Sequence, residues 1–297
     1  MGWKIYNFNP FTGSDNMKIL VTGSAGFIGN YVINELLKYD LDIIATDINI
    51  NKARERNWFD QVKFLSCDLN SRTDFFNYFE QPDAVIHLAW EGLPNYKEPF
   101  HIERNLPNNI SFLSNIIKAG LKKLTVTGTC LEYGLVNGCL GEDLITNPQN
   151  PYSIAKDTIR KYLESLESNY EFDLKWVRLF YLYGKGQSEK SILSQLEKAI
   201  VNKEKEFNMS GGEQLRDYLP IEKVAEIIVK ITLQNKVKGI INCCSGKPIS
   251  IRKLVENYLD TNGLLIKLNF GHFPYNDYEP FAFWGDNRKL MKVLDEN

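Results

Sequence analysis

The sequence has no apolar run that approaches the roughly 20 residues a membrane-spanning helix requires. Residues 1–16 contain one lysine and no apolar core, so they do not resemble a secretory signal. Internal repeats and low-complexity segments are also absent. The net charge of −2 shows no excess of basic residues, and nucleic acid is therefore not expected as a partner.

Histidine and cysteine are scarce, with three and five residues. No CxxC pair occurs, and no cysteine is spaced from a histidine as metal ligands are, so we predict no metal site. The odd number of cysteines and the adjacent pair Cys243-Cys244 favour reduced thiols in a cytoplasmic protein. The chain of 297 residues, 43% of them hydrophobic, is long enough to bury a substantial core.

Strand-like and helix-like segments alternate through the first 180 residues. The expected strands are 17–21, 41–46, 62–66, 84–88, 124–127 and 174–180. The first expected helix begins at Ile28, and two further helices are expected over 101–119 and 152–168. Apolar residues recur at helical spacing in these segments. The alternation predicts an α/β fold, namely a Rossmann-type doubly wound parallel sheet with right-handed crossovers.

Beyond residue 180 the alternation becomes less regular. Further helices are expected at 192–201, 220–233 and 251–259, the last with Ser250 as its N-cap, and a strand at 240–244. We therefore predict a dinucleotide-binding domain over 1–180 and a smaller C-terminal substrate-binding lobe over 181–297. The chain is expected to return to the first domain near 218–245, and residues 1–16 form an extension before the first strand.

A glycine-rich turn, Thr22-Gly23-Ser24-Ala25-Gly26-Phe27-Ile28-Gly29, joins the first strand to the first helix. In such a turn the first glycine permits a tight bend, the second lets the backbone approach a pyrophosphate, and the third lets the helix pack on its strand. The helix N-terminus then faces the phosphates. The cofactor-binding residues expected here are Gly23, Gly26, Phe27, Ile28 and Gly29.

Asp47 closes the second strand and bears on the choice of cofactor. A carboxylate at this place accepts hydrogen bonds from the adenosine ribose and repels a 2′-phosphate, which favours NAD over NADP. Lys52 and Arg54 lie close enough in the sequence to weaken this preference, so NADP stays an alternative.

The ends of the third and fourth strands supply further cofactor contacts. The expected residues are Asp68, Leu69, Leu88 and Ala89. The Asp68 carboxylate is suited to the adenine amine, and the backbone after the fourth strand passes the cofactor. His87 lies in an apolar strand, so we expect a buried, hydrogen-bonded histidine rather than a catalytic one.

Tyr152-Ser153-Ile154-Ala155-Lys156 places a tyrosine and a lysine four residues apart, on one face of an expected helix. A free tyrosine has a pKa of about 10, so it is a poor acid–base catalyst. The charge of Lys156, together with that of a nicotinamide ring, is expected to lower the pKa of Tyr152. Tyr152 is therefore the expected proton donor, and both residues are expected to contact the cofactor.

The glycine turn, Asp47, Cys67-Asp68-Leu69, His87-Leu88-Ala89-Trp90, Thr129 ahead of Tyr133-Gly134, and the Tyr152–Lys156 segment occur in this order. From Met17 to about Leu294 the chain resembles the extended short-chain dehydrogenase/reductases, the group of NAD(P)-dependent nucleotide-sugar epimerases, dehydratases and reductases. The resemblance implies a nucleotide-sugar substrate. It also implies a homodimer, because helices like 101–119 and 152–168 pack across a two-fold axis in these relatives.

The resemblance also assigns substrate-side residues. Thr129 matches the catalytic hydroxyl that hydrogen-bonds the reacting oxygen. The 4,6-dehydratases carry an acid pair directly after it, and Cys130 and Leu131 cannot replace that pair, which argues against water elimination. For Glu132 two alternatives stay open, a contact with the substrate and an ion pair at the lobe interface.

Two further positions bear on nucleotide binding. Arg216 lies in a segment that resembles the family's R-D-Y/F motif, and its guanidinium suits a diphosphate, with a surface ion pair as the alternative. Tyr181 stands where the family usually has asparagine, so the usual substrate contact is in doubt there.

Three functions remain open. The first is a reductase that delivers hydride to a 4-keto-6-deoxyhexose nucleotide, and the whole sequence most resembles bacterial reductases of dTDP- or CDP-linked sugars of this kind. The second is an NAD-dependent 4-epimerase, which would use the same residues. The third is a non-catalytic dinucleotide-binding protein. The family context suggests O-antigen or other polysaccharide sugar supply in the cytoplasm.

Overall fold

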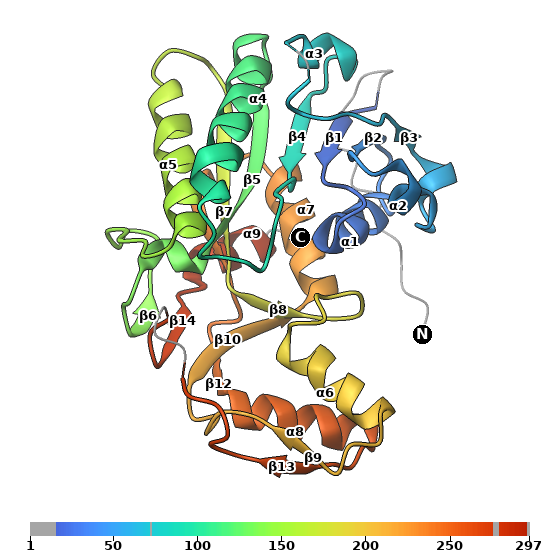
Figure 1. The fold of residues 1–297 in the computed structure, drawn as a ribbon. Coiled ribbons are helices and arrows are strands. Elements are labelled where there is room, and N and C mark those ends of the chain that lie inside the picture. The colour runs from blue at the N-terminus through green and yellow to red at the C-terminus, as the bar shows by residue number, and fades with distance from the viewer. Residues whose placement is uncertain (1–15, 72, 276–278, 296–297) are drawn as a thin grey trace.

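The computed structural model describes residues 16–71, 73–275 and 279–295. A seven-stranded parallel sheet carries helices on both faces, and a smaller lobe lies beyond the carboxyl ends of its strands (Figure 1). The predicted Rossmann-type doubly wound fold is therefore confirmed. Of the expected extension, residues 1–15 lie outside the described part of the chain. Across the described residues, no helix combines the length and the apolar character needed to cross a membrane.

The sheet reverses its strand order at one point. Its strands, in spatial order, are β11 (Gly239–Cys243), β7 (Asp173–Leu179), β5 (Lys123–Thr129), β4 (Ala84–His87), β1 (Lys18–Thr22), β2 (Asp42–Thr46) and β3 (Lys63–Phe64). The chain runs outward from β1 to β3 and then crosses to β4. Thr22 and His87, which end β1 and β4, are partners in register. Sheets of this kind bind ligands in the crevice at such a switch point.

Helices cover both faces of the sheet. One face carries α1 (Phe27–Leu36), α7 (Ile221–Leu233) and α9 (Arg288–Leu294). The other face mainly carries α3 (Phe75–Tyr78), α4 (Leu106–Lys118) and α5 (Pro151–Leu166). Successive residues of β1 point to opposite faces of the sheet. Ile19 and Val21 therefore join the apolar core under α1 and α7, and Leu20 joins the core under α4 and α5. Because both faces are covered, the central strands are nearly continuous apolar runs.

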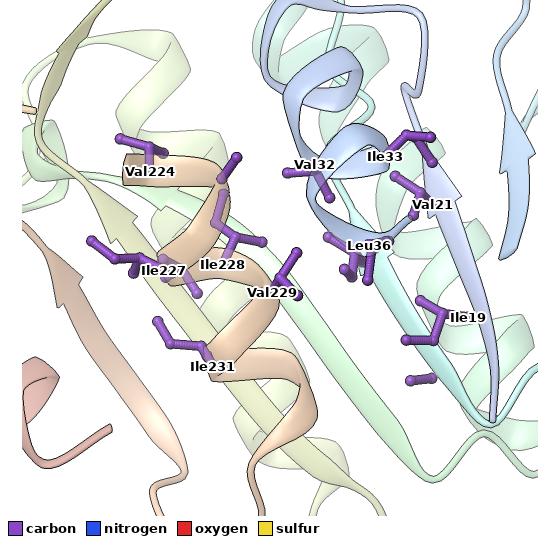
Figure 2. Packing of buried hydrophobic residues seen from close by; sticks show 14 of the residues in the cluster. Ile19, Val21, Val32, Ile33, Leu36, Val224, Ile227, Ile228, Val229 and Ile231 are labelled. Atoms are coloured by element: carbon purple, nitrogen blue, oxygen red, sulfur yellow. The ribbon is translucent and has the colours of Figure 1, made fainter. Parts of the chain in front are cut away.

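Helix α7 belongs to the large layer although it lies late in the sequence. Figure 2 shows Val32 and Leu36 of α1 facing the apolar residues of α7, which include Ile228 and Val229. Strand β11 follows α7 and pairs in parallel with β7. Residues 221–243 therefore complete the sheet and one of its two helical layers.

The small lobe is built from short elements around its own apolar cluster (Figure 1). They are β8 (Tyr181–Tyr183), α6 (Ile192–Val201), β9 (Glu206–Asn208), β10 (Leu215–Pro220), β12 (Pro248–Ser250), α8 (Ile251–Asn262) and β13 (Lys267–Asn269). The Ser250 side chain accepts a hydrogen bond from the Lys253 N–H, which confirms the predicted N-cap. A two-stranded sheet of β6 (Gly138–Leu140) and β14 (Phe283–Gly285) lies beside it.

The expected helix over 101–119 differs in its first turn. Residues His101–Asn105 form a π-helical turn (η2) before α4 begins at Leu106. The remaining short elements are α2 (Ile50–Arg54), η1 (Phe59–Gln61) and η3 (Cys130–Tyr133). Hydrophobic periodicity does not reveal a π turn, because the wider turn shifts side chains without changing residue types.

Candidate active site

The glycine-rich turn lies directly against the end of β4. Gly23 has a φ of +66°, and a Cβ there would stand 2.8 Å from the backbone nitrogen of Ala89. A Cβ at Gly29 would stand 2.2 Å from the Gly23 carbonyl oxygen. No side chain caps α1 at Gly26. The turn therefore has room for a phosphate but not for a side chain, and it fits the pyrophosphate of a dinucleotide.

A cavity beside this turn gathers the residues predicted to hold the adenosine half of the cofactor. Its lining includes Gly23, Gly26, Asp47, Asp68, Leu69, Leu88 and Ala89. The Asp47 carboxylate accepts hydrogen bonds from the backbone N–H groups of Ala25 (3.1 Å) and Asn49 (3.0 Å). These bonds fix the carboxylate at the end of β2. Lys52 lines the same cavity, so a cation also lies at this end of the site.

A second cavity, called here the catalytic cavity, joins the turn to the ends of β5 and α5. Its lining includes Phe27, Ile28, Gly29, Thr129 and Tyr152. Asn150 caps α5 by accepting a hydrogen bond from the Ser153 N–H at 3.0 Å, and Pro151 begins the helix. This start places Tyr152 in the first helical turn, where it faces Thr129.

The protein alone does not produce the predicted lowering of the Tyr152 pKa. Burial raises the pKa of Tyr152 well above its usual value, while a hydrogen bond with Thr129 acts in the opposite direction. The expectation that Lys156 lowers the pKa of Tyr152 did not include the desolvation of Tyr152, which is only 7% exposed. Tyr152 is therefore protonated at neutral pH, as a proton donor must be.

Lys156 lies beneath the catalytic cavity rather than on its surface. Its Nζ donates a hydrogen bond to the Thr127 carbonyl oxygen at 2.9 Å and stands 4.1 Å from the ring centroid of Trp90. Burial lowers the pKa of Lys156 to about 7, and Glu132 opposes this shift. Lys156 is thus a buried base that titrates near neutrality.

Trp90 is a site residue that the sequence reasoning did not select. Its ring lies edge-on to Tyr152, with centroids 5.7 Å apart, and it lines both cavities. Its indole N–H donates to Nδ1 of His101 at 3.1 Å, and Nε2 of His101 bonds the Asn95 carbonyl oxygen at 3.0 Å. The π turn supplies this histidine. The only local signal is a tryptophan three residues after the last residue of the fourth strand.

His87 is a structural residue, as predicted. Its Nδ1 lies 2.9 Å from the Thr22 hydroxyl and its Nε2 lies 2.6 Å from Oδ1 of Asn109. Burial lowers the pKa of His87 to about 3, so the ring is neutral. The Thr22 hydroxyl also accepts the backbone N–H of Leu88 at 3.2 Å, which joins the ends of β1 and β4.

Glu132 requires a correction. It is fully buried, and its carboxylate accepts hydrogen bonds from Arg178 Nε (2.7 Å) and from the Thr129 backbone N–H (2.8 Å). Trp176 donates its indole N–H to the same carboxylate at 3.0 Å. Glu132 does not line the catalytic cavity. Of the two alternatives, the structure shows the ion pair and not the substrate contact.

A third cavity, called here the nucleotide cavity, lies in the small lobe next to the catalytic one. Arg216 and Tyr181 line it together with Glu279, which the sequence reasoning missed. Arg216 donates from Nη2 to the Glu279 carboxylate at 3.0 Å and from Nη1 to the carbonyl oxygens of Leu215 and Phe281. Tyr181 donates its hydroxyl to Glu279. Arg216 is only 1% exposed, so its ion pair is internal and not on the surface.

These features define a class of protein: a nicotinamide-dependent oxidoreductase with a buried tyrosine and a threonine beside the switch point of a doubly wound sheet. The model of the NAD dependent epimerase/dehydratase family matches residues 19–244, which is most of the chain. The chain therefore belongs to this family, the extended short-chain dehydrogenase/reductases.

The relatives include two sugar 4-dehydrogenases from Aggregatibacter actinomycetemcomitans. The dTDP-6-deoxy-L-talose 4-dehydrogenase (NAD(+)) is 31% identical over 91% of this chain and 99% of its own length. The GDP-6-deoxy-D-talose 4-dehydrogenase is 26% identical over 94% of this chain and 91% of its own.

Among solved structures, the UDP-glucuronic acid 4-epimerase from Bacillus cereus, in complex with UDP-glucuronic acid and NAD, superposes with a TM-score of 0.82. It covers 95% of this chain and 94% of its own at 24% identity. At that identity the similarity supports the fold. Together, the family, the relatives and the fold show an NAD-dependent enzyme that modifies nucleotide sugars.

Proposed function

We propose that the protein is a 4-ketoreductase that uses a nicotinamide cofactor to reduce the 4-keto group of a 6-deoxyhexose linked to dTDP or CDP. The observation that carries the proposal is that Thr129 and Tyr152 line one cavity beside the glycine-rich turn, which is called here the phosphate cradle. Thr129 is followed by Cys130 and Leu131 instead of an acid pair. This arrangement suits redox chemistry at an alcohol or ketone carbon without loss of water. The similarity to a sugar 4-dehydrogenase supports it, because that reaction in reverse is a 4-keto reduction.

The bound cofactor supplies the hydride that converts the ketone carbon to a carbinol. Tyr152 donates its hydroxyl proton to the ketone oxygen, so that an alcohol forms and the tyrosine is left as the anion. Thr129 hydrogen-bonds the same oxygen and fixes its position. Lys156 lies one helical turn from Tyr152, beneath the cavity, and its charge stabilises that anion when the lysine is protonated. Arg216 and Tyr181 contact the nucleotide-sugar diphosphate and sugar.

The finer expectations belong to the same proposal. NAD is the preferred cofactor because of Asp47, with NADP as the alternative that Lys52 leaves open. The active form is a homodimer that packs through the surfaces of α4 and α5. The enzyme works in the cytoplasm and supplies sugars for O-antigen or other polysaccharide synthesis.

A 4-epimerase is the second candidate function, since several relatives carry that name. Both activities use the same residues, and they differ in whether the hydride returns to the sugar. Purification followed by release of bound nucleotide separates them. The 4-ketoreductase is expected to consume NADH or NADPH steadily only when a 4-keto-6-deoxyhexose nucleotide is present. Stoichiometric, non-exchanging NAD with no net consumption would identify the epimerase instead.

The role of Tyr152 has its own test. The Tyr152→Phe substitution removes the hydroxyl but keeps the ring that packs on Trp90. We expect turnover to fall by about 10²–10⁴-fold, the usual contribution of a general acid, while cofactor affinity stays within about twofold. NADH oxidation and NADH fluorescence titration measure the two quantities. Turnover that survives the substitution contradicts the assignment and favours the non-catalytic alternative for this residue.

A further inference from the structure

Glu279 is the charged residue that lines the substrate side of the catalytic cavity, whereas Lys52 lies at its cofactor end. Glu279 lines both the catalytic and the nucleotide cavity. Among the described residues that line the catalytic cavity, the charged side chains are Lys52 and Glu279, and Lys52 also lines the adenosine cavity. The substrate side of the catalytic cavity therefore presents a carboxylate and no cation.

Arg216 offsets part of this charge, but it does not itself line the catalytic cavity. Its guanidinium is bound to Glu279 and to two backbone carbonyl oxygens, and Arg216 lines only the nucleotide cavity. The pair is largely buried, with side chains that are 2% and 11% exposed. In such surroundings charges are poorly screened, so the position of each charge determines what it attracts.

The Glu279 carboxylate lines the same cavity as Thr129 and Tyr152, which are proposed to hold the reacting sugar oxygen. When Thr129 and Tyr152 hold the oxygen on C4, the C6 group on the neighbouring C5 lies only a few bonds away. Cys130 follows Thr129 in the cavity wall, and Glu279 is among the charges that raise the pKa of its thiol, after burial. Leu131 and Phe180 contribute apolar surface to the same cavity.

We infer that Glu279 is a specificity-determining residue that selects nucleotide sugars with an uncharged C6 group and excludes hexuronates. This inference rests on the proposed function, which names a 6-deoxy sugar. A C6 methyl group suits the apolar surface of the cavity, whereas a C6 carboxylate would face Glu279 without a cation between them. Each Glu279 oxygen accepts one protein donor, Tyr181 or Arg216, and keeps a lone pair for a sugar hydroxyl.

The test compares binding of matched nucleotide sugars to the NAD-loaded enzyme by calorimetry. The probes are UDP-glucose with UDP-glucuronate, and dTDP-glucose with dTDP-glucuronate, so that base and diphosphate are the same within each pair. The wild-type enzyme is expected to bind the uronate about 10-fold or more weakly than the neutral sugar. In the Glu279→Gln variant this ratio is expected to fall at least fivefold, because the side chain keeps its size and loses its charge.

Two controls make the ratio informative. Glu279→Asp keeps the charge and is expected to keep the discrimination. Glu206→Gln removes one charge from the ion pair with Lys267 in the same lobe, outside the cavities, and is expected to change neither affinity nor ratio. Thermal unfolding and NADH fluorescence establish that each variant is folded. If Glu279→Gln does not fold, the wild-type ratio and Glu279→Asp remain as the test.

Equal binding of both sugars by the wild type, or an unchanged ratio in Glu279→Gln, overturns the inference. The measurement uses binding and not turnover. The role of Glu279 and the proposed 4-ketoreductase activity can therefore be refuted independently of each other. An enzyme that discriminates as expected but does not oxidise NADH with a 4-keto-6-deoxyhexose nucleotide refutes only the proposed reaction.

Discussion

Glu132 shows at the scale of one residue how burial decides what a charge does. The side chain accepts hydrogen bonds from Arg178 and from the Thr129 backbone, and no part of it reaches solvent. It lies three residues after Thr129 and holds the turn that presents Thr129 by accepting the hydrogen bond from its backbone N–H. We therefore expect Glu132 to position Thr129 and not to contact the substrate.

Removal of Glu132 tests this role. The Glu132→Ala substitution leaves the Arg178 guanidinium buried without its carboxylate, which is expected to cost about 3–5 kcal/mol of unfolding free energy. Urea unfolding measures this loss. A residue that only contacted substrate would instead raise KM and leave the unfolding midpoint unchanged.

Lys156 predicts a pH dependence of stability. Its pKa is about 7 in the folded protein and about 10.4 in an unfolded chain. Between these values the unfolded state binds more protons, so the contribution of Lys156 to stability rises with pH from about 7 to about 10. The slope is at most about 1.4 kcal/mol per pH unit. Urea unfolding at pH 7 and 9.5 is expected to show this gain in the wild type and not in Lys156→Met. If the stability of the wild type and of Lys156→Met depends equally on pH, the pKa of Lys156 is not lowered in the folded protein.

At the scale of elements, the strand–turn–helix unit of β1 and α1 is the part most closely tied to local sequence. The turn needs glycine at two points because Ala89 and the Gly23 carbonyl leave no room for a Cβ. The start of helix α5 is also determined by local sequence, because Asn150 and Ser153 cap its N-terminus. These two units deliver the phosphate cradle and the tyrosine acid from opposite sides of the crevice.

The close packing of α1 against its turn can be tested at Gly29. Gly29→Ala places a methyl group 2.2 Å from a backbone carbonyl oxygen, so α1 must shift away from the cradle. We expect a loss of about 1–3 kcal/mol in unfolding free energy and at least about tenfold weaker NADH binding.

Gly141→Ala is the matched control for this substitution. The added Cβ meets only the end of the Asp143 side chain, which can move away. NADH fluorescence titration and thermal unfolding are expected to be unchanged in this control. If Gly29→Ala behaves like Gly141→Ala, the cradle does not depend on the close approach of helix and turn.

At the scale of the whole molecule, the large layer is not made by the first 180 residues alone. Helix α7 covers α1, and β11 adds the seventh strand beside β7 (Figures 1 and 2). Both elements are reached only after the chain has passed through β8, α6, β9 and β10 of the small lobe. The two lobes are therefore linked by more than one crossing of the chain.

A fragment that ends at residue 180 is expected not to fold. It lacks α7, β11 and α9, so Val32 and Leu36 of α1 and one edge of β7 would be exposed. We expect the 16–180 fragment to show no cooperative thermal transition by circular dichroism, in contrast to the 16–297 chain. A sharp transition in the fragment contradicts this view of the fold.

Local patterns predicted the order of the main strands and helices well, and they missed short elements. Strands β1, β2, β4, β5 and β7 and the main helices lie within a few residues of the expected ranges. The two-stranded pairs β9–β13 and β6–β14 have three residues in each strand, which is too short for a periodic signal. The π turn before α4 was missed for a related reason, since its register is set by the packing of His101.

The sequence by itself determined the fold class, the glycine-rich turn and the placement of Tyr152 and Lys156 on one helix, because these features depend on local patterns of residues. Only the tertiary structure decided which partners the charged groups have: Glu132 pairs with Arg178, Lys156 lies over the Trp90 ring, and Glu279 pairs with Arg216, 63 residues away. Burial, too, is a property of the folded chain, and in the protein alone it raises the pKa of Tyr152 instead of lowering it. Contacts of this kind depend on how the chain closes on itself, and no local pattern records them.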